Sequence, residues 1–207
     1  MASVIYQCIE QIGSKIIENK DFLTELDREI GDADHGVNMA RGYTEALKAI
    51  PQEEEDIGAV LKKTGMTLLS KVGGASGPLY GTAYMKAAKV AAGKKSLTLE
   101  DARAMMDEII AGIQLRGKAV RGEKTMLDAL IPASEALTAG MAEGKDVNAC
   151  LADMCRAAEE GVEYTKTIRA TKGRASYLGD RSIGHQDPGA TSSLYTLEAI
   201  RDFVAGL

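Results

Sequence analysis

Residues 5–17, IYQCIEQIGSKII, decide the fold class of this chain of 207 residues. Apolar side chains recur in this stretch at spacings of three and four, which is the pattern of a helix with one apolar face. Similar stretches follow along the sequence, whereas no segment of useful length alternates between apolar and polar residues. Aromatic residues make up only 4% of the chain, which also disfavours a β-rich fold. The sequence therefore predicts an all-α protein.

Capping residues mark where several of these helices begin. Asp56 is a candidate N-cap, and Thr98 with Asp101 resembles a capping box in which Asp replaces the usual Glu. Asp187-Pro188 provides a cap followed by the residue type favoured at the first helical position. We expect a single domain over residues 1–207, built as an all-α barrel or bundle of about eight antiparallel helices. Helical segments are expected near residues 5–17, 22–26, 37–47, 57–72, 79–90, 99–113, 126–141, 147–167 and 190–204, the second burying Phe22, Leu23 and Leu26.

Two local features interrupt this helical pattern. Pro132 lies inside the segment 126–141, where it should kink the helix or shift its start to Ile131. Residues 173–189 show no periodicity, and a loop of that length in a compact domain is typically functional.

Composition excludes several classes of protein. The chain has 25 Lys and Arg against 30 Asp and Glu, so it lacks the basic surface that nucleic-acid binding requires. No run of about eighteen apolar residues predicts a membrane span, and the N-terminus does not resemble a secretory signal. Three cysteines form no CxxC motif, which argues against a zinc site and a disulfide framework. We expect a cytoplasmic protein with no nucleic-acid or membrane partner.

The first candidate site consists of Asp27, Asp32 and Asp34. Three carboxylates brought together would repel one another unless a cation lies between them, and carboxylate oxygens suit Mg²⁺ or Ca²⁺. An EF-hand does not fit, because Gly36 and Tyr43 would occupy ligand positions. The alternative is that one aspartate caps the next helix and the others face solvent. Because Mg²⁺ usually shares its ligands with substrate phosphates, the cluster also predicts a phosphorylated ligand.

A second candidate site is the glycine-rich stretch VGGASGPLYGT at residues 72–82. The backbone N–H groups of such a turn at the start of a helix can bind phosphate. The alternative is that the glycines only end one helix and begin the next. Ser76 lacks the flanking glycines of a nucleophile elbow and is therefore a candidate hydrogen-bond donor. Residues 112–118 match seven positions of a P-loop, but Ala119 replaces the required Ser or Thr, so we reject that motif.

The third candidate site is the stretch 172–189, whose Lys172, Arg174 and Arg181 could neutralise phosphate oxygens. The alternative is a solvated basic loop. His185 alone is more typical of a structural histidine than of a catalytic base.

These segments carry a resemblance to a known family. Over residues 26–192 the chain resembles the nucleotide-binding L subunits (DhaL) of bacterial dihydroxyacetone kinases. The resemblance implies an eight-helix barrel that holds ADP or ATP at one end through two Mg²⁺ ions. The matching stretches are LDREIGDADHGVNMARG, TGMTLLSKVGGASGPLYGT, RGKAVRGEKTMLDAL and KGRASYLGDRSIGHQDPGATS.

The resemblance also implies roles for individual residues. Asp27, Asp32 and Asp34 are implied to be the metal ligands, which join the ions to the nucleotide phosphates. No side-chain nucleophile is implied, because the metals and positioning supply the catalysis. The residues implied to contact the nucleotide are His35, Gly36, Val37, Asn38, Ala75, Ser76, Gly117, Met126, Arg174, Asp187, Pro188 and Gly189, with Gly117 and Met126 near the adenosine.

The implied activity is that of the ADP-binding subunit of a multi-subunit, phosphoenolpyruvate-dependent dihydroxyacetone kinase. A separate K subunit would hold dihydroxyacetone through its own histidine, and a phosphohistidine carrier of the phosphotransferase system would rephosphorylate ADP in place. Two alternatives stay open: a nucleotide-bound regulatory module that docks on a transcription factor, and an ATP-exchanging kinase subunit for another short ketose. A metal-dependent phosphatase is a further alternative, which predicts that the chain alone releases free phosphate.

Overall fold

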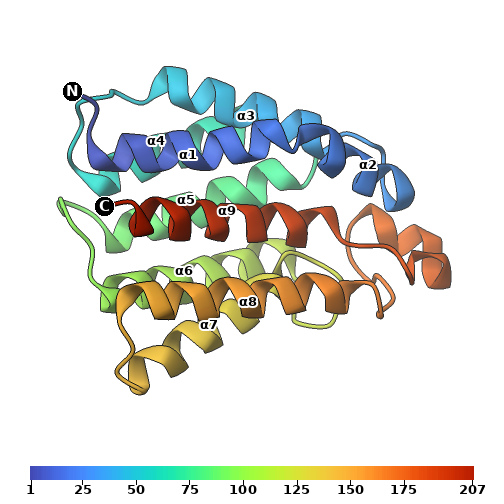
Figure 1. Ribbon diagram of the computed structural model, residues 1–207. Coiled ribbons are helices and arrows are strands. Elements are labelled where there is room, and N and C mark those ends of the chain that lie inside the picture. The colour runs from blue at the N-terminus through green and yellow to red at the C-terminus, as the bar shows by residue number, and fades with distance from the viewer.

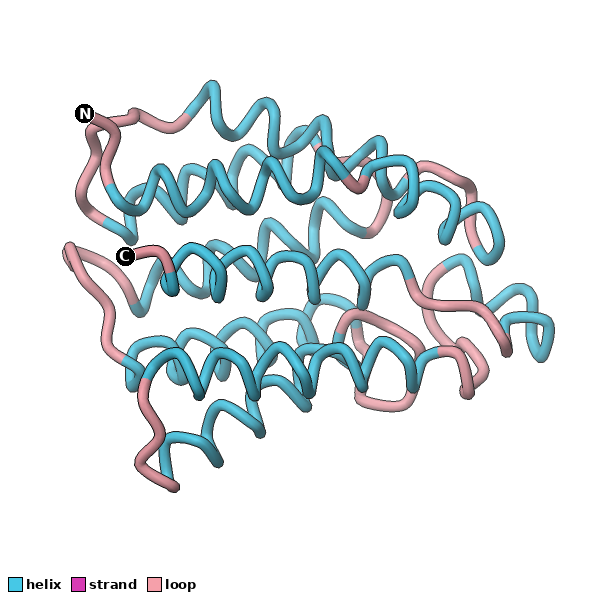
Figure 2. Tube along the Cα trace, viewed as in Figure 1, coloured by secondary structure: helices cyan, strands magenta, loops and turns pink.

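The computed structural model describes all 207 residues and contains only helices (Figure 1, Figure 2). The all-α prediction is confirmed. No helix is both long and apolar enough to span a membrane. The elements are α1 (Val4–Glu18), α2 (Lys20–Ile30), α3 (His35–Ala49), α4 (Ile57–Lys71), α5 (Ser76–Val90), α6 (Leu99–Gly117), α7 (Leu127–Ala142), α8 (Val147–Thr165), the 3₁₀ helix η1 (Arg174–Ser182) and α9 (Pro188–Ala205).

Eight of the nine α-helices form a closed ring. Each of α3 to α8 packs against the next helix along the chain, α1 packs against both α3 and α9, and the short α2 lies at one end (Figure 1). Successive ring helices run in opposite directions, so the connections fall alternately at the two ends. The prediction of about eight antiparallel helices is therefore confirmed, with α2 and η1 lying beyond the ring.

Aliphatic side chains from all of the ring helices meet inside the ring and form one continuous hydrophobic core. The face of α1 predicted from its periodicity supplies Ile9, Ile12 and Ile16, each at most 2% exposed. Burial of such a side chain stabilises the fold by roughly 1.5–3 kcal/mol. The packing of this core leaves a cavity of about 210 Å³ among its apolar side chains.

The predicted helix starts agree with the structure. The side chains of Asp56 and Asp187 each accept a backbone N–H three residues on, and Thr98 and Asp101 form a reciprocal capping box. Helix α7 begins at Leu127, so Pro132 lies inside the helix and does not move its start to Ile131. Residues 99–117 form one continuous helix, which confirms the rejection of the P-loop at 112–118.

Two local predictions are wrong. Phe22 is 47% exposed, because α2 lies outside the ring and buries only the side that carries Leu23, Asp27 and Ile30. Residues 173–189 are not structureless, since Arg174–Ser182 form a 3₁₀ helix that is kinked at Gly179. The helix η1 escaped detection because its i to i+3 geometry produces no amphipathic α-helical period.

Candidate functional site

The candidate site is a cavity of about 320 Å³ at the end of the ring where α2 lies. Four connections supply its walls, namely the segments between α2 and α3, between α4 and α5, between α6 and α7, and between α8 and α9. All three segments selected from the sequence meet here, although they are separated by up to 160 residues of chain. The lining side chains carry both signs of charge, with four aspartates, two lysines and two arginines.

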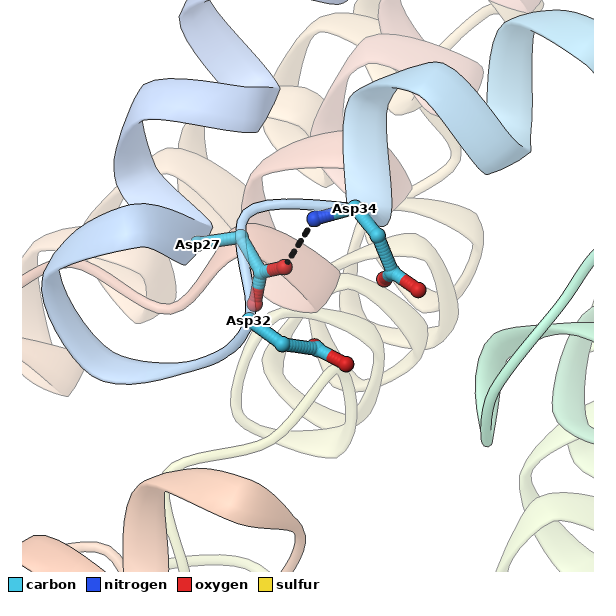
Figure 3. Close-up of side chains that lie close together, drawn as sticks. All are labelled: Asp27, Asp32 and Asp34. Carbon is cyan, nitrogen blue, oxygen red and sulfur yellow. Dashed lines mark hydrogen bonds between the residues drawn. The ribbon is translucent and has the colours of Figure 1, made fainter.

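The side chains of Asp27, Asp32 and Asp34 converge on one side of this cavity (Figure 3). Each offers a carboxylate oxygen, and the three oxygens lie within 4.8 Å of one another. Asp27 is buried on α2, and its Oδ2 accepts the backbone N–H groups of Asp34 and His35 at 2.8 and 3.1 Å. The turn between Asp32 and Asp34 passes through Ala33, whose φ of 58° is left-handed and strained for a residue with a Cβ. The buried Asp27 therefore fixes the loop that carries the other two carboxylates.

A cation is the ligand that this cluster fits. Three carboxylates within 4.8 Å repel one another, and hard divalent ions take oxygen ligands of this kind. Arg174 Nε lies 2.8 Å from Asp32 Oδ2 and is the one cationic side chain bonded to the cluster. Two of the three negative charges are left without such a partner, so the donor set suits Mg²⁺ or another hard cation.

The N-terminus of α5 offers a candidate phosphate cradle in the same cavity. Gly73, Gly74, Ala75 and Ser76 all line the cavity, and Gly74 has a φ of 63°. The first N–H groups of a helix have no partner within the helix and carry partial positive charge, so they attract an anion. An anion bound here would lie beside a cation held by the aspartates, as in a metal–phosphate complex.

His35 connects this cradle to the floor of the cavity. Its Nδ1 lies 3.0 Å from Ser76 Oγ and its Nε2 lies 2.8 Å from Ser192 Oγ, which in turn lies 2.6 Å from the Tyr80 hydroxyl. Burial lowers the pKa of His35 to about 4, against the opposing effect of the Asp27 charge, so the ring is neutral at pH 7. Both ring nitrogens are occupied by protein hydroxyls, and the imidazole therefore holds Ser76 in place.

Lys124 and Asp187 form a second charged group in the cavity wall. Lys124 is 1% exposed, and burial lowers its pKa, although nearby Asp187 and Asp128 oppose that effect. Burial raises the pKa of Asp187 to about 7, against the N–H of Ala190 and the charge of Lys124. The sequence analysis assigned no role to Lys124, because an isolated lysine in a turn carries no pattern.

Most residues that the resemblance implied do line the cavity. Those lining it are Asp27, Asp32, Asp34, His35, Ala75, Ser76, Gly117, Met126, Arg174, Asp187, Pro188 and Gly189.

The other three, Gly36, Val37 and Asn38, do not line the cavity. Gly36 packs against α2, since a Cβ there would lie 2.0 Å from the Lys20 carbonyl oxygen. Val37 is 46% exposed, and the Asn38 carboxamide oxygen accepts a hydrogen bond from Arg41 at 2.5 Å. That Gly36, Val37 and Asn38 contact the nucleotide stays a prediction.

The basic residues of the third segment separate into two groups. Lys172 and Arg174 line the cavity, whereas Arg181 does not. His185 lies outside the cavity and its Nδ1 is 3.6 Å from Glu29 Oε2. Gly73 and Gly74, which belong to the predicted glycine-rich site, line the cavity as well. Arg116 and Thr125 also line it but were not singled out from the sequence, since neighbouring sequence alone does not show which way each one faces.

The chain is similar to several known proteins. The DAK2 domain family matches residues 29–202. The chain is 46% identical over 197 residues to the ADP-binding subunit DhaL of the PEP-dependent dihydroxyacetone kinase of Escherichia coli K12, covering 95% of this chain and 94% of that subunit. It is 43% identical over 201 residues to the ADP-binding subunit DhaL of the PTS-dependent enzyme of Lactococcus lactis, covering 95% and 96% of the two chains.

A solved structure shows the same fold. The dihydroxyacetone kinase of C. freundii in complex with AMP-PNP and Mg²⁺ superposes with a TM-score of 0.72 and 24% identity, over 98% of this chain and 34% of that one. Human triokinase/FMN cyclase is 36% identical over 195 residues, which are 93% of this chain and 33% of that protein. The fold therefore occurs both as a chain of this length and as one third of longer proteins.

Proposed function

Since the chain belongs to the DAK2 domain family, we propose that it is the ADP-binding subunit of a phosphoenolpyruvate-dependent dihydroxyacetone kinase. The observation that carries the proposal is the convergence of Asp27, Asp32 and Asp34 beside the N-terminus of α5 in one cavity. The DhaL subunits named above support it, because each matches this chain along at least 94% of its own length.

The bound cofactor would be ADP or ATP with two Mg²⁺ ions. Asp27, Asp32 and Asp34 would hold the ions, which when bound supply charge neutralisation for the transferred phosphoryl group. Ser76 and the N–H groups around it would bind phosphate oxygens, and Arg174 would add a planar pair of donors.

The phosphoryl acceptor would come from another chain. Ser76 in the cavity contacts His35 Nδ1, but burial lowers the pKa of that imidazole to about 4, which makes it a weak base, and its other nitrogen is engaged by Ser192. Dihydroxyacetone would therefore be presented by a separate K subunit, and a phosphohistidine carrier of the phosphotransferase system would return a phosphoryl group to the bound ADP. The whole reaction would take place in the cytoplasm.

Native mass spectrometry of the purified protein, followed by a reconstituted assay, tests this function. We expect a retained mass of ADP and two Mg²⁺, and dihydroxyacetone phosphate formation over many turnovers once a K subunit, the phosphocarrier proteins and phosphoenolpyruvate are added. Failure of the chain to bind Mg·ADP would overturn the proposal. Weak ATP binding with turnover on ATP alone would favour an exchanging kinase, and release of free phosphate by the chain alone would favour a phosphatase.

A further inference from the structure

Lys124 is the most deeply buried charged side chain in the cavity wall. It lies in the connection between α6 and α7, is 1% exposed, and has a left-handed backbone with a φ of 61°. Burying a charge and straining a non-glycine backbone both cost free energy, so the surrounding structure must compensate for them. Lysine is rarely buried to this extent unless its ammonium has specific partners.

The partners of Lys124 lie in two other connections at the same end of the ring. Its Nζ donates to the carbonyl oxygen of Thr165 at 2.5 Å, at the end of α8, and to the carbonyl oxygen of His185. The turn that carries the lysine is fixed by the buried Asp128, whose carboxylate accepts the backbone N–H of Thr125 at 2.8 Å. Lys124 therefore joins the chain before α7 to the chain before α9.

The bonds from Lys124 and Thr165 position the first residues of α9. Thr165 Oγ1 accepts the backbone N–H of Asp187 at 3.0 Å, and Asp187 Oδ2 accepts the N–H of Ala190 at 2.7 Å. Gly189 packs close to this carboxylate and to Met126, since a Cβ on Gly189 would lie 3.1 Å from Asp187 Oδ2 and 3.7 Å from Met126 Cβ. Met126, Asp187 and Gly189 thus form one continuous wall of the cavity, which we call the α9 wall.

Apolar side chains, including Met126 of the α9 wall, give part of the cavity a different chemistry from the carboxylate cluster. The apolar side chains that line the cavity include Ile113, Leu79 and Met126. Leu79 lies against Gly117, where a Cβ would be 3.2 Å from Leu79 Cδ2. A cation and phosphates occupy the charged side of such a cavity, so the flat and less polar nucleoside belongs against the apolar side.

We propose that Lys124 is a positioning residue for the nucleoside half of the ligand, acting through the α9 wall. The inference rests on the proposed function, because it takes the ligand to be a metal–nucleotide complex. Lys124 would set how closely the Asp187–Gly189 segment approaches Met126, and so the width of the space for the nucleoside. The phosphate half would depend on it much less, since Asp27 fixes the aspartate loop and Ser76 is connected to α9 only through His35 and Ser192.

The test compares two probes that share the phosphate half. Nucleotide-free protein is titrated calorimetrically with Mg·ADP and with Mg·pyrophosphate, and the ratio of the two Kd values is measured. In Lys124→Gln we expect the Kd for Mg·ADP to rise about tenfold, the effect of losing a charge-assisted contact that orders the wall. The Kd for Mg·pyrophosphate should stay within twofold.

Two further variants make the result independent of folding defects. Thr165→Val keeps the charge and volume but removes the oxygen that accepts the Asp187 N–H, and it should change the ratio in the same direction. Lys94→Gln, at the opposite end of the ring in the connection before α6, makes the same chemical change and should leave the ratio unaltered. Circular dichroism and thermal unfolding establish that each variant is folded.

The possible outcomes distinguish the inference from the proposed function. If the unaltered chain bound neither probe, the proposed function would fail, and the inference with it. If the unaltered chain bound both and neither Lys124→Gln nor Thr165→Val changed the ratio, only the role of Lys124 would be overturned. Equal weakening of both probes in the two variants would also overturn it, because that pattern indicates general loss of structure.

Discussion

Replacing Asp34 by Asn should make the metal-free protein more stable and the nucleotide-bound protein less stable. The substitution keeps the size of the side chain and the backbone N–H that donates to Asp27 Oδ2. It removes one of three carboxylates whose oxygens lie within 4.8 Å of one another. The negative charge of Asp34 destabilises the metal-free fold and is needed to bind the cation. Removing it should therefore have opposite effects on the stability of the metal-free and the nucleotide-bound protein.

The magnitude of the first effect follows from Coulomb's law. Two unit charges 4.8 Å apart repel by about 0.9 kcal/mol at the dielectric constant of water and by more at a half-buried site. Asp34 faces both Asp27 and Asp32, which gives about 1.7 kcal/mol, although Arg174 offsets part of the Asp32 charge. Loss of a negative charge at the start of α3 costs about 0.3–1 kcal/mol. The net gain should be about 1 kcal/mol, or about 3 °C in Tm for a chain of this size.

The second effect follows from ligand linkage. At a concentration of Mg·ADP one hundred times its Kd, the unaltered protein gains about 2.7 kcal/mol. The variant should gain almost nothing, because it retains only two of the three predicted metal ligands. The order of the two melting temperatures should therefore reverse when Mg·ADP is added.

Thermal unfolding followed by fluorescence, in EDTA and then in Mg·ADP, measures both effects. Asp107→Asn provides the matched control, since it makes the same change on the exposed face of α6, where Asp107 pairs with Arg103. An Asp34→Asn variant that melts no higher than the unaltered protein in EDTA would show that the cluster is not repulsive. Retention of the full Mg·ADP shift would show that Asp34 is not a metal ligand.

Three other predictions concern packing, pH and phosphate binding. Gly161→Ala should lower the free energy of unfolding by about 2–3 kcal/mol in urea, because the new Cβ would lie 2.0 Å from the Asp128 carbonyl oxygen and force α7 and α8 apart. His35, with its pKa lowered to about 4, binds a proton in the unfolded chain below pH 6.5 but not in the folded one, so relative to His35→Gln the metal-free protein should lose about 3 kcal/mol between pH 6.5 and 4. Asp187, with its pKa raised from 3.8 to about 7, contributes in the opposite direction, because its stabilising effect is present at low pH and is lost as the pH rises towards 7. Since Asp187 is present in both proteins, the comparison with His35→Gln isolates the effect of the imidazole. Arg174→Gln should weaken Mg·ADP binding about tenfold and change stability by less than about 1 kcal/mol, because its pair with the aspartate cluster is exposed.

Each of these predictions has a control variant or a result that would contradict it. Arg169→Gln removes a similar exposed arginine, paired with Asp180 at 3.3 Å, and should not affect nucleotide binding. Equal weakening by Arg169→Gln and Arg174→Gln would point to general electrostatics. A Gly161→Ala variant of unaltered stability would show that α7 and α8 can separate freely. If the free energy of unfolding changed with pH in the same way in the unaltered protein and in His35→Gln, the imidazole would have to be hydrated.

Local chemistry predicted the helices and their starts well. Capping at Asp56, Thr98 and Asp187 depends only on residues within three positions, so it can be recognised from sequence. The exposure of Phe22 depends on α2 lying outside the ring, which is a tertiary property that its own periodicity does not contain. The helix η1 lacks the α-helical period and was therefore missed.

The same distinction between local and tertiary features applies to the candidate site. Asp32 and Asp34 are close in sequence and their chemistry is unusual, so their convergence was foreseeable from repulsion and metal preference. Lys124 was not, because its importance comes from carbonyl oxygens 41 and 61 residues away along the chain. A lysine beside glutamate in a turn is typical of an exposed side chain, and only the tertiary fold shows that this one is buried.

The alternation of helix direction explains why distant segments share one cavity. In a ring of antiparallel helices, every second connection returns to the same end, so the connections before α3, α5, α7 and α9 lie together. These four contain the carboxylates, the phosphate cradle, Lys124 and Arg174. The connections before α4, α6 and α8 lie at the opposite end and supply none of the cavity lining. The binding site is thus assembled by the order of the helices, and each connection has only to provide the right few residues at its own corner.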